Sequence, residues 1–179
     1  MRVITGSARG RNLRTLEGEN VRPTTDRVKE AIFSIIQFEI EGRRVLDLFA
    51  GSGQLGIEAL SRGAAEATFV DADKNALACV KENLAKTELS AHASPVQTDA
   101  FSFLKMTAKQ FDLVFLDPPY GTGLLQKAVL GLSDCVAPGG LVICESPYGE
   151  ELPAEAGELQ KYRTYKYGKI AVTTYRKNA

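Results

Sequence analysis

The chain has 179 residues, of which 44% are hydrophobic and 25% charged, and its 22 basic and 22 acidic side chains cancel at neutral pH. These values predict one domain whose core needs no disulfide staples. The longest apolar runs, such as residues 111–116, are too short to span a membrane and no apolar signal region opens the chain, so we expect a soluble cytoplasmic protein without membrane partners.

Charge is distributed unevenly along the chain. Residues 1–29 carry seven basic and three acidic side chains, a net charge of +4, and residues 159–179 carry six basic side chains and no acidic one. Basic ends around an acidic middle suit the binding of phosphates beside a site for a cationic cofactor. An ordinary solvated surface is the alternative reading.

The first predicted helix begins at Thr25 or Asp26, either of which can cap it. Its apolar side chains recur at helical spacing, so that one face packs on a large surface: they are Val28, Ala31, Ile32, Ile35 and Ile36.

From Arg43 onward, short apolar runs alternate with amphipathic stretches. We predict strands over 45–49, 67–70, 93–97, 111–116 and 141–144, and helices over 55–62, 74–86, 101–106 and 125–136, the last ended by Pro138-Gly139-Gly140. Alternation of this kind predicts an α/β fold with a parallel sheet covered on both faces.

The end of the chain breaks this rhythm. Residues 160–167 and 170–175 alternate with period two around Gly168, which predicts an antiparallel hairpin. A mostly parallel, doubly wound sheet with such a hairpin is typical of the Rossmann-like fold of S-adenosylmethionine-dependent methyltransferases. We expect one domain over 1–179, with a basic N-terminal extension over 1–24 and a catalytic core over 25–179.

The turn after the first strand carries a glycine motif. Gly51, Gly53 and Gly56 match the G-x-G-x-x-G of dinucleotide-binding proteins, and Asp71 and Asp73 lie where a ribose-binding acid is expected, so an NAD-dependent dehydrogenase is one alternative. Asp47, four residues before the first glycine, disfavours it because a carboxylate repels a pyrophosphate. A sulfonium or ammonium ligand would instead be attracted.

S-adenosylmethionine fits each of these elements. Gly51 and Gly53 let the backbone approach the ligand, Asp47 would lie near its cationic amino-acid part, and Asp71 would accept its ribose hydroxyls. Asp73 is more simply a helix cap, and Asp99 is either a second cap or the acceptor of the adenine amino group. The remaining cofactor-binding candidates are Phe49, Ala100 and Asp117.

Asp117-Pro118-Pro119-Tyr120 directly follows the fourth predicted strand and supplies the catalytic candidates. The two prolines make a stiff platform because their φ angles are fixed and they lack an N–H group. Asp117 and the Pro118 carbonyl can accept the hydrogens of an exocyclic amino group, and Tyr120 can stack on a flipped base. A merely rigid strand-to-helix turn is the alternative.

Several segments together extend this pattern. VLDLFAGSG at 45–53, VDAD at 70–73, TDA at 98–100 and DPPY at 117–120 resemble the amino-methyltransferase motifs in their usual order. ARGRNL at 8–13, RPTTDRVKEAIFSII at 22–36, IEALSRGA at 57–64 and the GKIAVTTYRK ending resemble the bacterial RsmD-type family, which methylates a guanine N2 amino group of small-subunit ribosomal RNA. Ser7-Ala8 and Gln54 depart from the pattern of that family.

The resemblance implies S-adenosylmethionine as cofactor and 16S rRNA as substrate, in an assembling or assembled small subunit, with activity of the guanine(966)-N2 type. It also implies that Arg9, Arg11, Arg14 and Arg22 bind RNA and that the reaction needs no metal. The three cysteines and His92, the only histidine, have no zinc-type spacing. Adenine-N6 methylation of DNA or RNA stays open, as does protein glutamine methylation or a non-catalytic assembly factor.

Overall fold

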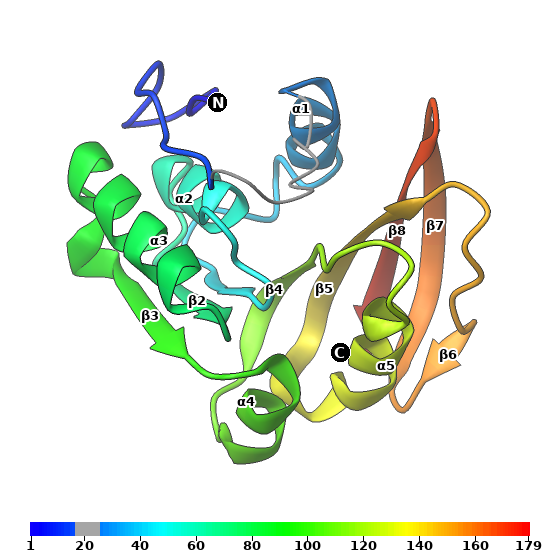
Figure 1. Cartoon of the computed structure of the whole chain (residues 1–179). Helices are drawn as coiled ribbons and strands as arrows, with labels where there is room; N and C mark the ends of the chain where they lie inside the picture. Colours follow the sequence, from blue (N-terminus) through cyan, green and yellow to red (C-terminus); the bar gives the residue numbers. More distant parts are fainter. Residues whose placement is uncertain (17–25) are drawn as a thin grey trace.

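The computed structural model describes residues 1–16 and 26–179 (Figure 1). Two predictions, a cap at Thr25 and RNA binding by Arg22, lie outside the described residues. In chain order the helices are α1 (Asp26–Ile35), α2 (Gln54–Ser61), α3 (Lys74–Thr87), α4 (Ala100–Met106) and α5 (Leu124–Gly131), with two 3-10 turns, η1 (Ser90–His92) and η2 (Ser133–Cys135). The strands are β1 (Arg44–Asp47), β2 (Glu66–Asp71), β3 (Ala93–Gln97), β4 (Phe111–Leu116), β5 (Val136–Pro147), β6 (Glu155–Ala156), β7 (Leu159–Tyr167) and β8 (Ile170–Lys177).

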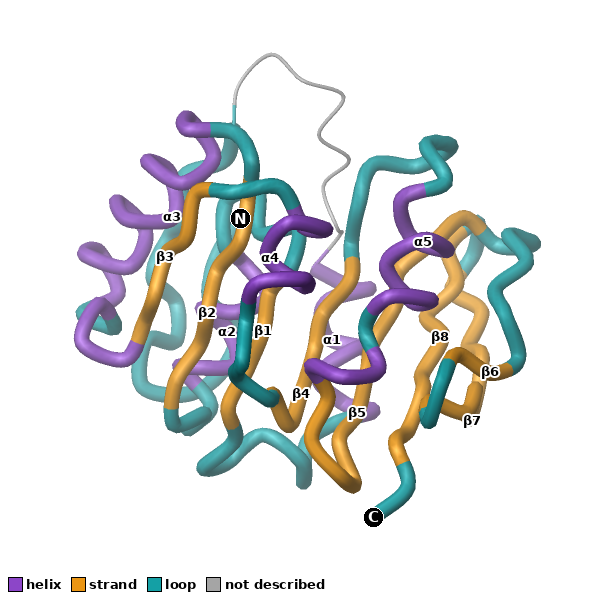
Figure 2. Tube along the Cα trace, turned by 90° about the horizontal axis from the view of Figure 1, so that it is seen from below, coloured by secondary structure: helices purple, strands orange, loops and turns teal. Residues whose placement is uncertain are grey.

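The eight strands form one sheet in the order β3-β2-β1-β4-β5-β8-β7-β6. The first five are parallel, and β8, β7 and β6 continue the sheet antiparallel. Figure 2 shows α4 and α5 on one face, with α1 and α2 on the other. The predicted doubly wound parallel sheet with a terminal antiparallel hairpin is therefore confirmed.

Each face of the sheet has its own core. On the α1 side, helix residues such as Ile32 and Ile57 pack against Val45 and Phe69, and the rings of Phe33 and Phe115 lie 5.6 Å apart. On the α5 side, Val129 and Leu132 belong to the cluster that covers Val142 and Tyr175. Nearly continuous burial of β4 on both faces explains why its residues are apolar apart from Asp112, which pairs with Arg44.

The boundary between α5 and β5 differs from the prediction. The helix ends at Gly131 instead of Val136, and Val136 already pairs with Phe111 of β4. The Pro138-Gly139-Gly140 stretch lies inside β5, where Gly139 has φ +74° and the β4–β5 register shifts. These residues thus form an irregularity within a strand, a place where Pro and Gly are tolerated.

The N-terminal segment 1–16 packs on the α1 face of the core. Val3, Ala8 and Leu13 are buried, and the close approach to α2 leaves no room for a side chain at Gly6, whose ideal Cβ would lie 1.7 Å from the Ser61 carbonyl oxygen. Ser7 N donates to that oxygen at 2.8 Å. The first 16 residues therefore form part of the folded body.

A buried ion pair fastens this segment to two helices. Lys29 Nζ lies 3.1 Å from Glu58 Oε2, both side chains are fully buried, and Lys29 also donates to the Arg2 carbonyl at 2.9 Å. Glu58 accepts from the backbone N–H groups of Ile4 and Thr5 at 2.9 and 3.0 Å. Burial lowers the pKa of Lys29, while Glu58 opposes that shift.

All three cysteines, Cys79, Cys135 and Cys144, are free and buried. Burial raises the pKa of each thiol, which keeps it protonated. Among the described residues, no helix combines the length and apolar character needed to cross a membrane.

Candidate active site

A cavity of about 1200 Å³ opens where the strand order reverses between β1 and β4. In open α/β sheets this is the place where ligands bind, beyond the carboxyl ends of the strands. All the predicted catalytic and cofactor-binding residues except Gly53 line it. They are Asp47, Phe49, Gly51, Asp71, Asp99, Ala100, Asp117, Pro118, Pro119 and Tyr120.

Asp47 ends β1 at the floor of the cavity and is 2% exposed. Its Oδ2 accepts a hydrogen bond from Gly56 N in the first turn of α2 at 3.0 Å. Burial raises the pKa of Asp47 to about 8, and the negative charges of Asp117 and Asp71 add to the shift. The carboxylate thus occupies a helix N-terminal amide and would gain a counter-ion from a cationic ligand.

The glycine turn allows two close approaches. Gly53 has φ +81°, a conformation that favours glycine, and its N–H donates to the Ala50 carbonyl at 2.7 Å. An ideal Cβ on Gly56 would lie 2.3 Å from Phe69 Cε1, so the third glycine lets α2 pack directly on β2. The motif therefore shapes the turn and the helix packing whether or not the ligand is a dinucleotide.

The acidic residues that follow β2 and β3 make structural hydrogen bonds, and some of them also line the cavity. Asp71 accepts from Gly51 N and Asp73 N, both at 2.9 Å, and so orders the cavity wall. Asp73 caps α3 by accepting from Asn75 N, as predicted. Asp99 caps α4, and hydrogen bonds from Ser102 lower its pKa. Asp99 is therefore a cap that also lines the cavity, where its charge remains available to a ligand.

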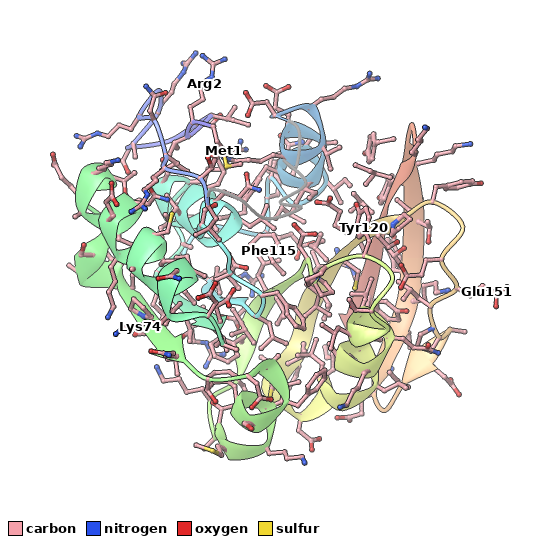
Figure 3. All side chains as sticks on the ribbon, viewed as in Figure 1. Met1, Arg2, Lys74, Phe115, Tyr120 and Glu151 are labelled. Carbon is pink, nitrogen blue, oxygen red and sulfur yellow. The ribbon has the colours of Figure 1, made fainter. Side chains whose placement is uncertain are left out.

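Asp117 to Tyr120 lie at the end of β4, on the same cavity as Asp47. Pro118 is buried, whereas Asp117 and Tyr120 are half-buried. Thr122 Oγ1 donates to the Pro119 carbonyl at 2.7 Å, which fixes the turn from the far side. In Figure 3 Tyr120 lies toward the terminal hairpin, whereas Phe115 lies nearer the middle of the sheet.

Sequence reasoning missed Glu145, which is 1% exposed in β5 and accepts a hydrogen bond from Tyr120 Oη at 3.1 Å. An acid at the end of an apolar strand is a signal that could have identified it. Met1, Thr15 and Leu16 also line the cavity, and no pattern in the sequence indicates this because it depends on how residues 1–16 dock.

The N-terminal arginines differ in their surroundings. Arg9 is exposed, whereas Arg11 pairs with Glu88 at 3.0 Å and Arg14 with Glu82 at 2.6 Å, both on or just after α3. Exposed pairs of this kind are weak and can reopen for a phosphate. Within 1–16 and 26–179, no group of three or more His, Cys, Asp or Glu side chains is arranged to hold a metal ion.

Comparisons with known proteins identify similar chains. The family model described as Conserved hypothetical protein 95 matches residues 1–176. YlbH of Bacillus subtilis (strain 168) is 46% identical over 183 residues, which covers 99% of both chains. Ribosomal RNA small subunit methyltransferase D of Escherichia coli (strain K12) is 37% identical over 181 residues, covering all of this chain and 91% of the relative.

Solved structures share the fold. The structure of yhhF from Escherichia coli has a TM-score of 0.89 at 37% identity and covers 100% of this chain and 98% of its own. The 16S rRNA N2 G1207 methyltransferase RsmC of Thermus thermophilus, solved with AdoMet and guanosine, has a TM-score of 0.70 at 25% identity over 91% of this chain and 45% of its own.

The match over nearly the whole chain, at 37–46% identity, agrees with the motif order and with the cavity at the β1–β4 switch point. The chain belongs to the RsmD family.

Proposed function

We propose that the protein transfers a methyl group from S-adenosylmethionine to the exocyclic N2 amino group of a guanine in 16S rRNA, with activity of the guanine(966)-N2 type. The single observation that carries the proposal is that Asp117 and Pro118 face the same cavity as Asp47 and the glycine turn. A carboxylate and a carbonyl suited to an amine thus lie beside a pocket suited to a cationic ligand. Membership of the RsmD family supports the coarser activity, rRNA methylation in the small subunit.

The cavity residues fit S-adenosylmethionine by charge. Five aspartates line the cavity, and among its described lining residues there is no Lys, Arg or His. Asp47 and Asp117 would hold the cationic part, while Asp71, Asp99 and Ala100 would contact the nucleoside. When bound, the cofactor supplies an electrophilic methyl group.

The acceptor amine must be oriented by the protein, because its lone pair is delocalised into the base. Asp117 and the Pro118 carbonyl accept its two hydrogens, which directs the lone pair into the cavity. The charge of Asp117 also stabilises the positive charge that develops on nitrogen. Orientation of this kind contributes roughly 7 to 11 kcal/mol in favourable intramolecular reactions.

The base must leave its pair to reach this site, since N2 lies on the paired edge of guanine. The Tyr120 ring provides the stacking surface, with Pro119 exposed beside it. Adenine N6 methylation would use the same carboxylate and carbonyl. Guanine N2 is favoured because RsmC, which shares the fold, is an N2 methyltransferase whose structure contains guanosine.

A dehydrogenase is disfavoured by the same geometry. Dinucleotide-binding turns offer helix N-terminal amides to a pyrophosphate. Here the Gly56 amide already donates to Asp47, so it is not free to bind a phosphate. Five acidic side chains line the cavity, and no basic side chain among its described lining residues would balance the charge of a pyrophosphate.

Ribosomal RNA implies a cytoplasmic site of action and a small-subunit particle as the partner, with residues 1–179 acting as one domain. Within it, Arg9, Arg11 and Arg14 would contact RNA phosphates once the pairs of Arg11 and Arg14 open. These arginines lie beside α3. They would therefore contact RNA on the side of the cavity that is opposite β5.

The deciding experiment incubates the protein with isotopically labelled S-adenosylmethionine and small subunits lacking the modification, and maps the label by mass spectrometry. We expect one labelled guanine carrying the methyl group on N2. Label on adenine would support N6 methylation instead, and no label on either naked 16S rRNA or particles would contradict the proposal. Asp117→Ala, which should bind cofactor and transfer no methyl group, is the matched control.

A further inference from the structure

We propose that the terminal hairpin β7–β8 carries a binding surface for single-stranded RNA that flanks the methylated base. This inference rests on the proposed function. The surface, called here the hairpin patch, consists of Tyr148, Lys166 and Lys169 near the tip of the hairpin. Tyr162 and Arg163 form a similar pair further from the tip, and the register places Arg163 on the opposite face of β7 from Lys166.

The cations of the hairpin patch, and Arg163, are not neutralised. Residues 159–179 contain no acid, and in the described part of the chain no carboxylate lies within ion-pair distance of Arg163, Lys166 or Lys169. All three side chains are exposed. In contrast, Arg176 and Lys177 of β8 pair with Glu39 and Glu158. The positive charge of the hairpin is therefore concentrated where it can meet phosphates.

Exposed aromatic rings accompany these charges. Tyr148 and Tyr162 are 54% and 58% exposed. Lys166 Nζ lies 4.1 Å from the Tyr148 ring centroid, and Arg163 Cζ lies 5.6 Å from that of Tyr162. Cations along a sheet edge protect it from pairing with other chains, but that role does not require exposed rings. Rings beside unpaired cations are the combination that binds single strands, by stacking and phosphate contact.

The open edge of β7 makes this surface accessible. The short strand β6 pairs with β7 only at Leu159 and Gln160, so residues 163–167 of β7 have no strand on their outer side among the described residues. In Figure 1 the hairpin tip rises beside α1 at the margin of the sheet. Glu151, the acid labelled in Figure 3, lies at the outer margin of the molecule, below that tip.

The sheet register connects the hairpin patch with the catalytic platform. Glu145, which holds Tyr120, pairs with Val172, and Val172 pairs with Tyr165. In the next row Ser146 pairs with Ala171, and Ala171 with Lys166. Two strand spacings of about 4.8 Å put β7 roughly 10 Å from Glu145. An extended strand leaving the active site can reach that far within a few nucleotides.

The partner is a single strand because the rings would stack on bases that are already unpaired. A flipped guanine also requires unpaired neighbours or a distorted helix. A duplex would present only phosphates to the rings. Binding of a duplex is therefore the competing outcome of the test.

The test uses fluorescence anisotropy with a short unstructured RNA and with the same sequence annealed to its complement, over a series of salt concentrations. Lys166→Ala/Lys169→Ala should weaken single-strand binding about tenfold or more and reduce the slope of log K against log salt by about 1.4, at about 0.7 per contact. Tyr148→Ala should weaken binding by about 5- to 100-fold with the slope unchanged, and Tyr148→Phe should bind normally.

The matched control is Lys81→Ala/Lys105→Ala, which removes two exposed lysines on α3 and α4. An equal loss in this control, unchanged binding by the hairpin variants, or an equal loss for duplex RNA would overturn the inference. Because binding is measured without methyl transfer, the result is independent of the proposed reaction. If the wild-type protein methylates rRNA and the hairpin variants still bind RNA normally, the RNA-binding role of the hairpin patch is wrong and the proposed reaction stands.

Discussion

The Tyr120 hydroxyl donates to the carboxylate of Glu145 across the gap between the β4 turn and β5, at 3.1 Å. Glu145 is 1% exposed, so this hydrogen bond is shielded from water. The prolines fix the backbone end of Tyr120, and Glu145 fixes the far end of its ring. A stacking surface held at both ends needs no reordering when a base arrives.

Tyr120→Phe tests this relationship, since it keeps the ring and removes the hydroxyl. A hydrogen bond to a charged group contributes about 1.5 to 3 kcal/mol, so we expect methyl transfer to fall about 10- to 100-fold. Cofactor affinity, measured by calorimetry with S-adenosylhomocysteine, should not change. Glu145→Gln keeps an acceptor and should retain more activity than Glu145→Ala.

The control for this prediction is the double variant Tyr120→Phe/Glu145→Gln. If the two residues act through one hydrogen bond, the combined loss in kcat/KM is smaller than the product of the single losses. Multiplicative losses would show that Glu145 does not act through the hydroxyl.

Asp117→Ala should reduce turnover by orders of magnitude and leave cofactor binding nearly intact. Asp117→Asn should be almost as inactive, because an amide can direct N–H groups at the substrate amine and carries no charge. Single-turnover kinetics with saturating RNA and cofactor measure the chemical step directly. Turnover equal to the wild type in either variant would remove Asp117 from the chemistry.

Asp47 makes stability and cofactor binding depend on pH. Its folded pKa of about 8 lies above the usual value, so the folded state holds a proton between about pH 4 and 8 that the unfolded state releases. The stability contributed by the protonated group is complete below about pH 4 and is lost as the pH rises through 8, by about 1.4 kcal/mol per pH unit at the steepest. Asp47→Asn should flatten this decline in urea unfolding.

Cofactor binding supplies a second measurement for Asp47. A cation beside the carboxylate favours its ionised form, so binding at pH 7 should release a proton. Calorimetry in buffers of different ionisation enthalpy would detect that release. The Asp47→Asn variant should bind the cofactor more weakly and release no proton. Proton release by this variant would show that a group other than Asp47 loses the proton.

Glu58→Gln removes the charge that balances Lys29. An ammonium left buried without its counter-ion costs about 3 to 5 kcal/mol of the free energy of unfolding. The pKa of Lys29, already lowered by burial, falls further in the variant, so the loss shrinks as the pH is raised and the lysine becomes neutral. Amide exchange at Ile4 and Thr5 should accelerate.

The ion pair between Arg44 and Asp112 is the control for this prediction, because Arg44 is 46% exposed. Arg44→Ala should cost at most about 1 kcal/mol. Similar losses in the free energy of unfolding for the two variants would mean that burial does not make the Lys29–Glu58 pair more important for stability than an exposed pair.

Sequence periodicity was sufficient for most of the fold, because a buried parallel strand and an amphipathic helix have different patterns. The bounds of β3 and β4 were predicted to the residue. The end of α5 was not, because Leu132 to Val136 continue the apolar helical spacing while pairing with Phe111 draws Val136 into β5. The end of this helix is set by a contact between residues far apart in sequence, which local sequence propensity cannot predict.

For the candidate site, acids at strand ends were predictable because parallel strands bring their carboxyl ends together. The capping roles of Asp73 and Asp99 could also be predicted from the sequence, because each residue directly precedes a helix. Glu145 was overlooked although it directly follows the predicted strand over 141–144, because no recognised motif includes it. The contribution of Met1 and Leu16 depends on docking over long separations, which no local pattern records.

The docking of residues 1–16 also has a consequence for how the chain acquires its structure. Their partners Glu58, Ser61 and Asn83 lie 53 to 69 residues further along, so this segment leaves the ribosome well before the helices that receive it. Contacts so distant in sequence form late and slowly. During synthesis we therefore expect Val3 and Leu13 to stay exposed to solvent until α3 is complete.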